Sequence, residues 1–251
     1  MQALPDIGAH SALFLDFDGT LAELAPQPDA VRVPPGTVAL LGALQARLGG
    51  ALAILTGRPV EDIDLLLPTL CLAVAGEHGA LLRWADGRRQ NLAPNTAATP
   101  GNALADVVQA AAAVAALHPA LVLERKPAGV ALHYRHAPAL QALCRATLAQ
   151  AIAAAPGLEL LEGKCVVEAK QRGVDKGRAL TALMAQPPFA GRMPLFAGDD
   201  VTDEPAIAAA QHLGGLGIKV GPGATAARLR LPGPAAVHTW LASALHAPLA
   251  S

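Results

Sequence analysis

The feature that most constrains the fold is the stretch Leu13–Thr20, where a short apolar run leads directly into Asp16, Asp18 and Gly19. A strand that is apolar on both faces belongs in a buried parallel sheet. Carboxylates at its end then lie at a solvent opening, where ligands bind in open α/β sheets. If the chain stays extended, Asp16 and Asp18 point to the same side, and a cation would relieve their repulsion.

Magnesium suits such a site better than zinc, because carboxylate oxygens are present and no cluster of His and Cys adjoins them. Taken alone, the pattern also fits an ordinary strand followed by an Asp-Gly turn. A second acidic segment favours the metal site, since the apolar run Met193–Ala197 leads into Gly198–Glu204, which contains Asp199, Asp200 and Asp203. These acidic groups repel one another unless a cation lies among them. The alternative is a loop that only caps the next helix.

Polar groups also follow two further predicted strands and begin a predicted helix. The apolar run Ala51–Leu55 ends in Thr56-Gly57-Arg58, where a hydroxyl and backbone amides could hold a phosphate oxygen, or where the chain simply turns. His78, flanked by glycines after the next predicted strand, either lines the site or is structural. Lys176 stands at a predicted helix start, where its charge opposes the helix dipole and indicates an anionic partner. A solvated lysine is the alternative.

The alternation of strands and helices stops near Asn95 and is replaced by helix, two strands, helix and two strands. The fold class we predict is α/β, with a Rossmann-like parallel sheet formed by residues 1–95 and 172–251 and an inserted α+β domain of residues 96–171. Polar residues at alternating strand positions of this insert could form one face suited to sugar hydroxyls and charge, or could face solvent. They are Glu124, Lys126, His133, Tyr134, Arg135, Lys164, Glu168 and Lys170.

Charge and composition exclude several classes of partner. The 251 residues contain 19 basic and 20 acidic side chains, and the formal net charge of −1 gives no field that attracts nucleic acid or an anionic membrane. Residues 1–10 lack the basic and apolar regions of a signal peptide, and the apolar runs are too short to span a bilayer. The three cysteines are far apart and are expected to be buried thiols. We therefore expect a cytoplasmic protein without nucleic-acid or membrane partners.

Four segments resemble, in order, the motifs of the haloacid-dehalogenase (HAD) superfamily: Asp16–Thr20, Thr56–Arg58, Lys176 and Gly198–Glu204. Four further segments are similar to patterns of the trehalose-6-phosphate phosphatase family within it. These are Gly76–Gly79, Leu132–Arg135, Gly163–Glu168 and Gly173–Gly177. The resemblance covers nearly the whole chain. One departure is Lys126-Pro127-Ala128-Gly129, where the family pattern has glycine directly after the lysine.

The resemblance implies a HAD core with an inserted cap, and magnesium-dependent hydrolysis of trehalose 6-phosphate in trehalose biosynthesis. Asp16 would be the nucleophile that forms an aspartyl-phosphate, Asp18 the general acid and base, and Thr56 and Lys176 the groups that bind phosphoryl oxygens. Magnesium would be held by Asp16, the Asp18 carbonyl and Asp199, with Asp200 or Asp203 in support. The implied substrate contacts are Asp16, Asp18, Gly19, Thr20, Gly57, Arg58, His78, Glu124, Lys126, His133, Arg135, Lys164 and Glu168.

Several alternatives keep the same catalytic residues. The substrate could be sucrose phosphate or a hexose phosphate, and a phosphomutase would retain the same motifs. A non-catalytic sensor, or a partner of a sugar-phosphate synthase, is disfavoured because binding alone does not require a nucleophile. The expected partners are a small sugar phosphate as substrate and, functionally, a trehalose-6-phosphate synthase.

Overall fold

A computed structural model describes residues 4–25, 27, 30–92, 103–126 and 129–246. The chain forms two compact units, each described here by itself. Unit 1 comprises Met1–Ala25, Asp29–Leu92 and Asp175–Ser251, and unit 2 comprises Pro26–Pro28 and Ala93–Val174. The boundary expected at residues 95 and 96 lies outside the described residues. The return to unit 1 comes after Val174, slightly later than the expected change at residues 171 and 172.

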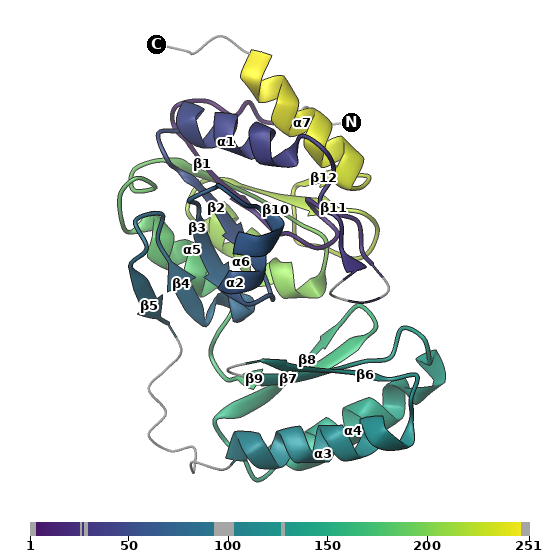
Figure 1. Ribbon diagram of the computed structural model, residues 1–251. Coiled ribbons are helices and arrows are strands. Elements are labelled where there is room, and N and C mark those ends of the chain that lie inside the picture. The colour runs from purple at the N-terminus through teal and green to yellow at the C-terminus, as the bar shows by residue number, and fades with distance from the viewer. Residues whose placement is uncertain (1–3, 26, 28–29, 93–102, 127–128, 247–251) are drawn as a thin grey trace. The chain divides into compact units, whose positions relative to one another are not determined.

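Unit 1 is built on an eight-stranded sheet with the order β12-β11-β10-β1-β2-β3-β4-β5 (Figure 1). The six strands from β12 to β3 are parallel, and β4 and β5 form an antiparallel edge hairpin. The bounds are β1 Ser11–Leu15, β2 Leu52–Leu55, β3 Ala73–Gly76, β4 Leu81–Arg83, β5 Arg89–Asn91, β10 Met193–Gly198, β11 Leu216–Val220 and β12 Leu229–Leu231.

Strand β1 lies between β10 and β2, with Leu15 opposite Ala197 on one side and Ile54 on the other. Its five residues are all buried, as expected for a central parallel strand. From β1 the chain adds β2 and β3 in one direction, and after unit 2 it adds β10, β11 and β12 in the other. The carboxyl ends of β1 and β10 therefore form the switch point of the sheet, where α/β folds bind ligands.

Helices cover both faces of this sheet. Helix α1 packs on α7 and helix α5 packs on α6, on opposite faces (Figure 1), as right-handed crossovers running in opposite directions require. The helix bounds are α1 Thr37–Arg47, α2 Val60–Leu66, α5 Lys176–Met184, α6 Glu204–His212 and α7 Pro234–His246, with the 3₁₀ turns η2 Glu77–Gly79 and η4 Val201–Asp203.

The apolar runs predicted as strands of unit 1 are confirmed as β1, β2 and β10, and the helix predicted to start at Lys176 is confirmed as α5. Strand β12 was not predicted, because Leu229-Arg230-Leu231 is too short for its alternation to stand out from a loop. The helix after the acidic segment begins with the 3₁₀ turn η4 before α6.

Unit 2 is a four-stranded antiparallel sheet with the order β6-β7-β9-β8, covered on one face by two helices (Figure 1). Its core is separate from that of unit 1 and contains Val107, Leu132, Leu148 and Val167. The bounds are α3 Ala103–Leu117, β6 Val122–Lys126, β7 Gly129–His133, η3 Pro138–Leu140, α4 Gln141–Ile152, β8 Leu158–Gly163 and β9 Val166–Gln171. These match the predicted order of helix, two strands, helix and two strands.

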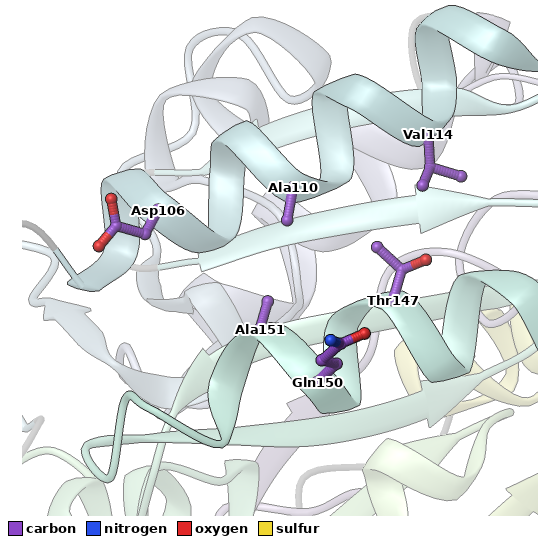
Figure 2. Close-up of a pocket in the computed structure, with 6 residues that line it drawn as sticks. All are labelled: Asp106, Ala110, Val114, Thr147, Gln150 and Ala151. Atoms are coloured by element: carbon purple, nitrogen blue, oxygen red, sulfur yellow. The ribbon is translucent and has the colours of Figure 1, made fainter.

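A groove runs between α3 and α4 (Figure 2). Its lining residues are Asp106, Ala110, Val114, Thr147, Gln150 and Ala151. None of these is a site residue predicted from the sequence, and the small side chains of Ala110 and Ala151 account for the space between the helices.

Among the described residues, no helix has both the length and the apolar character needed to cross a bilayer. The three cysteines are free thiols, but only Cys144 is fully buried; Cys71 is exposed, contrary to the expectation of buried thiols. Cys71 lies just before the amino end of β3, where the chain has not yet entered the core.

Phe14 on β1 is fully buried and stacks on Phe189, with their ring centroids 5.3 Å apart. The Phe14→Ala variant should lower the free energy of unfolding by about 3–5 kcal/mol, because it opens a cavity beside the central strand. Leu65→Ala on α2 is the control: this side chain is 82% exposed, and its loss should change stability by less than about 0.5 kcal/mol. Equal losses in urea denaturation would contradict the packing assigned to Phe14.

Candidate active site

Three carboxylates meet at the switch point of the unit 1 sheet. Asp16 follows β1, and Asp199 and Asp203 follow the neighbouring strand β10. Each offers a carboxylate oxygen, and these oxygens all lie within 4.8 Å of one another. Asp16 and Asp203 are buried, with 4% and 0% of their surfaces exposed. The two acidic segments identified in the sequence therefore form one site.

The chain bends sharply just after β1. The Phe17 carbonyl accepts hydrogen bonds from the Leu21 and Ala22 amides, at 2.9 and 3.0 Å. Gly19 has a φ of +84°, and a Cβ there would lie 2.3 Å from Asp199 Cγ. The glycine thus allows both the turn and the close approach of the Asp199 carboxylate.

The two carboxylates that follow β1 have different partners. Asp16 joins Asp199 and Asp203, whereas Asp18 is paired with Arg58. The Arg58 guanidinium donates from Nε and Nη2 to the two Asp18 oxygens at 2.7 and 2.8 Å. Such a two-point pair fixes the orientation of the Asp18 carboxylate.

Lys176 is the first residue of α5 and is buried, with only 2% of its surface exposed. Its Nζ atom donates hydrogen bonds to Asp16 Oδ1 and to Asp203 Oδ1, both at 2.6 Å. Asp175 caps the helix by accepting from the Arg178 amide at 2.8 Å, which fixes where α5 begins. The anionic partner expected for Lys176 thus includes two carboxylates of its own chain.

The pKa values of Asp16 and Lys176 are both shifted by burial and by the charges around them. Burial raises the pKa of Asp16 well above its usual value, Asp203 and Asp199 raise it further, and Lys176 only partly offsets them. Burial acts to lower the pKa of Lys176, but the Asp16 and Asp203 carboxylates outweigh it and raise that pKa. Lys176 therefore does not fully offset burial and the neighbouring carboxylates at Asp16, and a further cation beside them would favour the ionised form of Asp16.

Asp203 and Asp200 have different positions. Asp203 Oδ2 accepts the Asp200 amide at 2.9 Å, while its other oxygen binds Lys176. The Asp200 carboxylate turns back to accept the Val201 amide at 2.8 Å and caps η4. Asp203, and not Asp200, therefore belongs to the three-carboxylate group. Gly198 makes room for it, since a Cβ there would lie 2.4 Å from Asp203 Cγ.

The segment Thr56–Arg58, which follows β2, carries the Arg58 partner of Asp18. Thr56 is buried, and its hydroxyl accepts the Arg58 amide at 3.1 Å. A Cβ on Gly57 would lie 2.6 Å from the His78 ring, so glycine there allows His78 to pack against the turn. Thr20 is also fully buried, and its hydroxyl has no hydrogen-bond partner among the described residues. The predicted site residues of unit 1 therefore surround the ends of β1, β2 and β10.

Four predicted residues of unit 2 share one face of its sheet. The register aligns Glu124, Ala131 and Glu168 across three strands, on the face opposite to that of the core residues Leu132 and Val167. Lys126 Nζ donates to Glu168 at 2.7 Å, with each side chain only 7% exposed. His133 Nε2 lies 2.8 Å from Glu124.

Burial would raise the pKa of Glu124, but the His133 hydrogen bond and the Lys126 charge lower it overall. The two remaining candidates lie beyond the strand ends: Arg135 is half-buried after β7, and Lys164 is exposed in the turn between β8 and β9. The turn after Lys126, which departs from the family pattern, falls on residues 127 and 128 and lies outside the described residues.

Two buried lysines were not predicted as site residues. Lys219 on β11 donates to the Asp199 carbonyl at 2.6 Å, and Lys170 on β9 donates to Glu159 at 2.8 Å and to the Val174 carbonyl. Their exposed fractions are 3% and 8%. For Lys219 the available signal was a lysine inside an otherwise apolar strand, because a buried ammonium requires a polar partner, whereas the strand of Lys170 also carries Glu168 and Gln171.

The sequence model of a family described as trehalose-phosphatase matches residues 14–234, which span both units and every motif above. The chain belongs to the trehalose-phosphatase family. It is therefore a phosphatase, and the three-carboxylate site and the polar strands of unit 2 both fall inside the family match.

The family assignment agrees with individual relatives. The trehalose-6-phosphate phosphatase of Escherichia coli strain K12 is 41% identical over 238 residues, covering 94% of this chain and 87% of that protein. A crystal structure described as a trehalose-6-phosphate phosphatase related protein aligns with a TM-score of 0.76 and 27% identity, over 93% of this chain and 96% of that one.

A phosphatase of the haloalkanoate (HAD) enzyme superfamily from Bacteroides thetaiotaomicron aligns at 14% identity with a TM-score of 0.58, over 96% of each chain. This likeness concerns the fold alone. The predicted α/β fold of HAD type, with its inserted α+β part, is confirmed for this trehalose-phosphatase family member.

Lys176→Met should lower the free energy of unfolding at pH 7 by about 3–5 kcal/mol, because it leaves two buried carboxylates without their ammonium partner. Urea denaturation measures this change. Lys164→Met is the matched control, since Lys164 is exposed and its removal should cost less than about 1 kcal/mol. A loss for Lys176→Met no larger than that of the control would show that the network is not a stabilising one.

Proposed function

We propose that this chain hydrolyses trehalose 6-phosphate to trehalose and phosphate, with magnesium as cofactor and an aspartyl-phosphate on Asp16 as intermediate. The observation that carries the proposal is the grouping of Asp16, Asp199 and Asp203 around Lys176 at the switch point. The substrate is inferred from relatives such as the Escherichia coli enzyme, whose name specifies trehalose-6-phosphate.

The residues present fit a magnesium ion. The donor set consists of carboxylate oxygens, which magnesium prefers, and burial together with the Asp203 and Asp199 carboxylates raises the pKa of Asp16, which a bound cation would counteract. Asp16 and Asp199 would hold the ion, with Asp203 in support and, by resemblance, the Asp18 carbonyl. When bound, the cation would offset the repulsion between the phosphoryl group and the carboxylates and keep Asp16 ionised.

In the proposed first step, an oxygen of Asp16 attacks phosphorus while the bond from phosphorus to the sugar oxygen breaks. Asp16 Oδ1 is bound by Lys176, whereas Oδ2 accepts no hydrogen bond from a described residue and is the oxygen we assign as nucleophile. Asp18 gives a proton to the leaving sugar oxygen. In the second step, Asp18 takes a proton from water as that water attacks phosphorus, which releases phosphate and restores Asp16.

The remaining unit 1 residues would bind and orient the phosphoryl group. Lys176, which donates to Asp16 and Asp203, and the hydroxyl of Thr56 would stabilise charge as it builds on the phosphoryl oxygens. Arg58 holds both oxygens of the Asp18 carboxylate, which favours its ionised form, so this pair would have to open at one oxygen before Asp18 carries a proton to the leaving sugar oxygen. The unpartnered hydroxyl of Thr20 is a further donor for a phosphate oxygen.

We assign residues 1–95 and 172–251 as the catalytic core and residues 96–171 as a cap that recognises the sugar. Support comes from the polar face of the unit 2 sheet, where Glu124, Lys126, His133 and Glu168 form two hydrogen-bonded pairs. The Lys126–Glu168 pair at 2.7 Å and the His133–Glu124 pair at 2.8 Å could each exchange their partners for sugar hydroxyls. A trehalose-6-phosphate synthase would supply the substrate.

Magnesium should stabilise the free enzyme, because it binds a folded site that the unfolded chain lacks. At about a hundred times its Kd it should add about 2.7 kcal/mol to the free energy of unfolding, which a thermal-shift measurement with and without the ion detects. Asp199→Asn should abolish the shift, and Asp86→Asn, a change in an exposed hairpin carboxylate, should not. A shift that persists in Asp199→Asn would contradict the metal assignment.

The function is tested by phosphate release from a panel of phosphate esters with magnesium. We expect kcat/KM for trehalose 6-phosphate to exceed that for sucrose 6-phosphate and glucose 6-phosphate by about ten-fold or more, because each unpaired polar group in a site built for hydroxyls costs about 1–3 kcal/mol. Higher activity on either of the other two sugars would replace the proposed substrate.

In the same assay, Asp16→Asn should retain less than about a thousandth of wild-type kcat, because an amide cannot act as the nucleophile. Asp86→Asn should retain full activity. A normal fold with substantial turnover in Asp16→Asn would rule out the aspartyl-phosphate.

A further inference from the structure

Lys219 is a buried lysine on β11, the second strand from one edge of the unit 1 sheet. It lies near the end of β11, opposite Gly198 of β10, one position beyond the Ala197–Ile218 pair. With 3% of its surface exposed, its ammonium requires compensation inside the protein. Its one hydrogen bond to a described residue goes to the backbone carbonyl of Asp199, at 2.6 Å.

This bond joins strand β11 to the acidic loop that follows the neighbouring strand β10. The acidic loop Gly198–Glu204 follows β10, and the loop Gly221–Ala226 follows β11. Lys219 reaches from β11 to the acidic loop, and Glu204 reaches back, accepting the Ala226 amide at 2.9 Å. Gln211 on α6 adds a third tie by donating to the Ala226 carbonyl at 3.0 Å. The acidic loop is therefore anchored at both ends to the next strand and its loop.

We infer that Lys219 is a positioning residue for the metal site: by holding the Asp199 carbonyl, it fixes the peptide that aims the Asp199 carboxylate at Asp16 and Asp203. This inference rests on the proposed magnesium site. The Asp199 carboxylate packs against Gly19, where a Cβ would lie 2.3 Å from Asp199 Cγ, so it has little room to adjust if its peptide moves.

Two effects of Lys219 oppose each other. Its positive charge repels a cation nearby, and removing it would on that ground strengthen magnesium binding. Its hydrogen bond holds a ligand in place, and magnesium requires near-ideal octahedral geometry. The Lys219 ammonium contacts a backbone carbonyl and not a carboxylate of the cluster, so we assign it the positioning effect. The two effects predict opposite changes in magnesium affinity when Lys219 is removed.

The test compares Lys219→Met in the full chain with the wild type. Magnesium affinity is measured by calorimetric titration without substrate, and kcat and KM for p-nitrophenyl phosphate are measured at saturating magnesium. We expect magnesium binding about ten-fold weaker, within the range observed when groups that orient metal ligands are removed. We also expect a lower kcat at unchanged KM. Wild-type or tighter magnesium binding would overturn the inference.

Arg192→Met is the matched control. Arg192 also donates to backbone carbonyls, those of Ala9 and Ser11, but at the amino ends of β1 and β10. Arg192→Met should lower the free energy of unfolding while keeping wild-type magnesium affinity and kcat. If magnesium binding is weakened equally in both variants, the effect reflects general stability and the inference is overturned.

If Lys219→Met does not fold, Lys219→Gln takes its place, with the same weaker binding expected and wild-type affinity as the contrary result. Failure of the wild type to bind magnesium would instead refute the proposed metal site itself.

Discussion

The hydrogen bonds from the buried Lys176 ammonium to Asp16 and Asp203 are the interaction on which the site depends. They join the end of β1, the start of α5 and the loop after β10, although Lys176 and Asp16 are 160 residues apart. A buried charge is costly without a partner, so these three segments are stable only when assembled together. The same contacts leave one oxygen of Asp16 available for chemistry.

The sheet topology explains why these segments meet. The chain leaves β1 in one direction, passes through unit 2, and returns to the opposite side of β1 as β10. The polar residues that end β1, β2 and β10 therefore gather at one edge, and glycines at positions 19, 57 and 198 supply the space that their side chains occupy. Lys219 extends this arrangement to β11, from which it ties down the acidic loop.

Unit 2 carries a different kind of polar surface. Its Lys126–Glu168 pair is nearly as buried as Lys176, yet it lies on the sheet face opposite to the unit's own core. A buried ion pair is often no more stabilising than apolar residues of similar size. Its presence on this face therefore agrees better with the recognition of a polar ligand than with a purely structural role, in line with the proposed cap function.

The sequence by itself determined the α/β fold, the inserted α+β part and nearly every strand and helix, because apolar runs and their turns are local signals. It also identified Asp16, Lys176 and the acidic loop, since charges at the ends of apolar strands stand out. Only the tertiary structure decided that Asp18 pairs with Arg58, that Asp203 and not Asp200 joins the cluster, and that Lys219 holds Asp199. These outcomes depend on a bend after Leu15 and on contacts between distant strands, which no local pattern encodes.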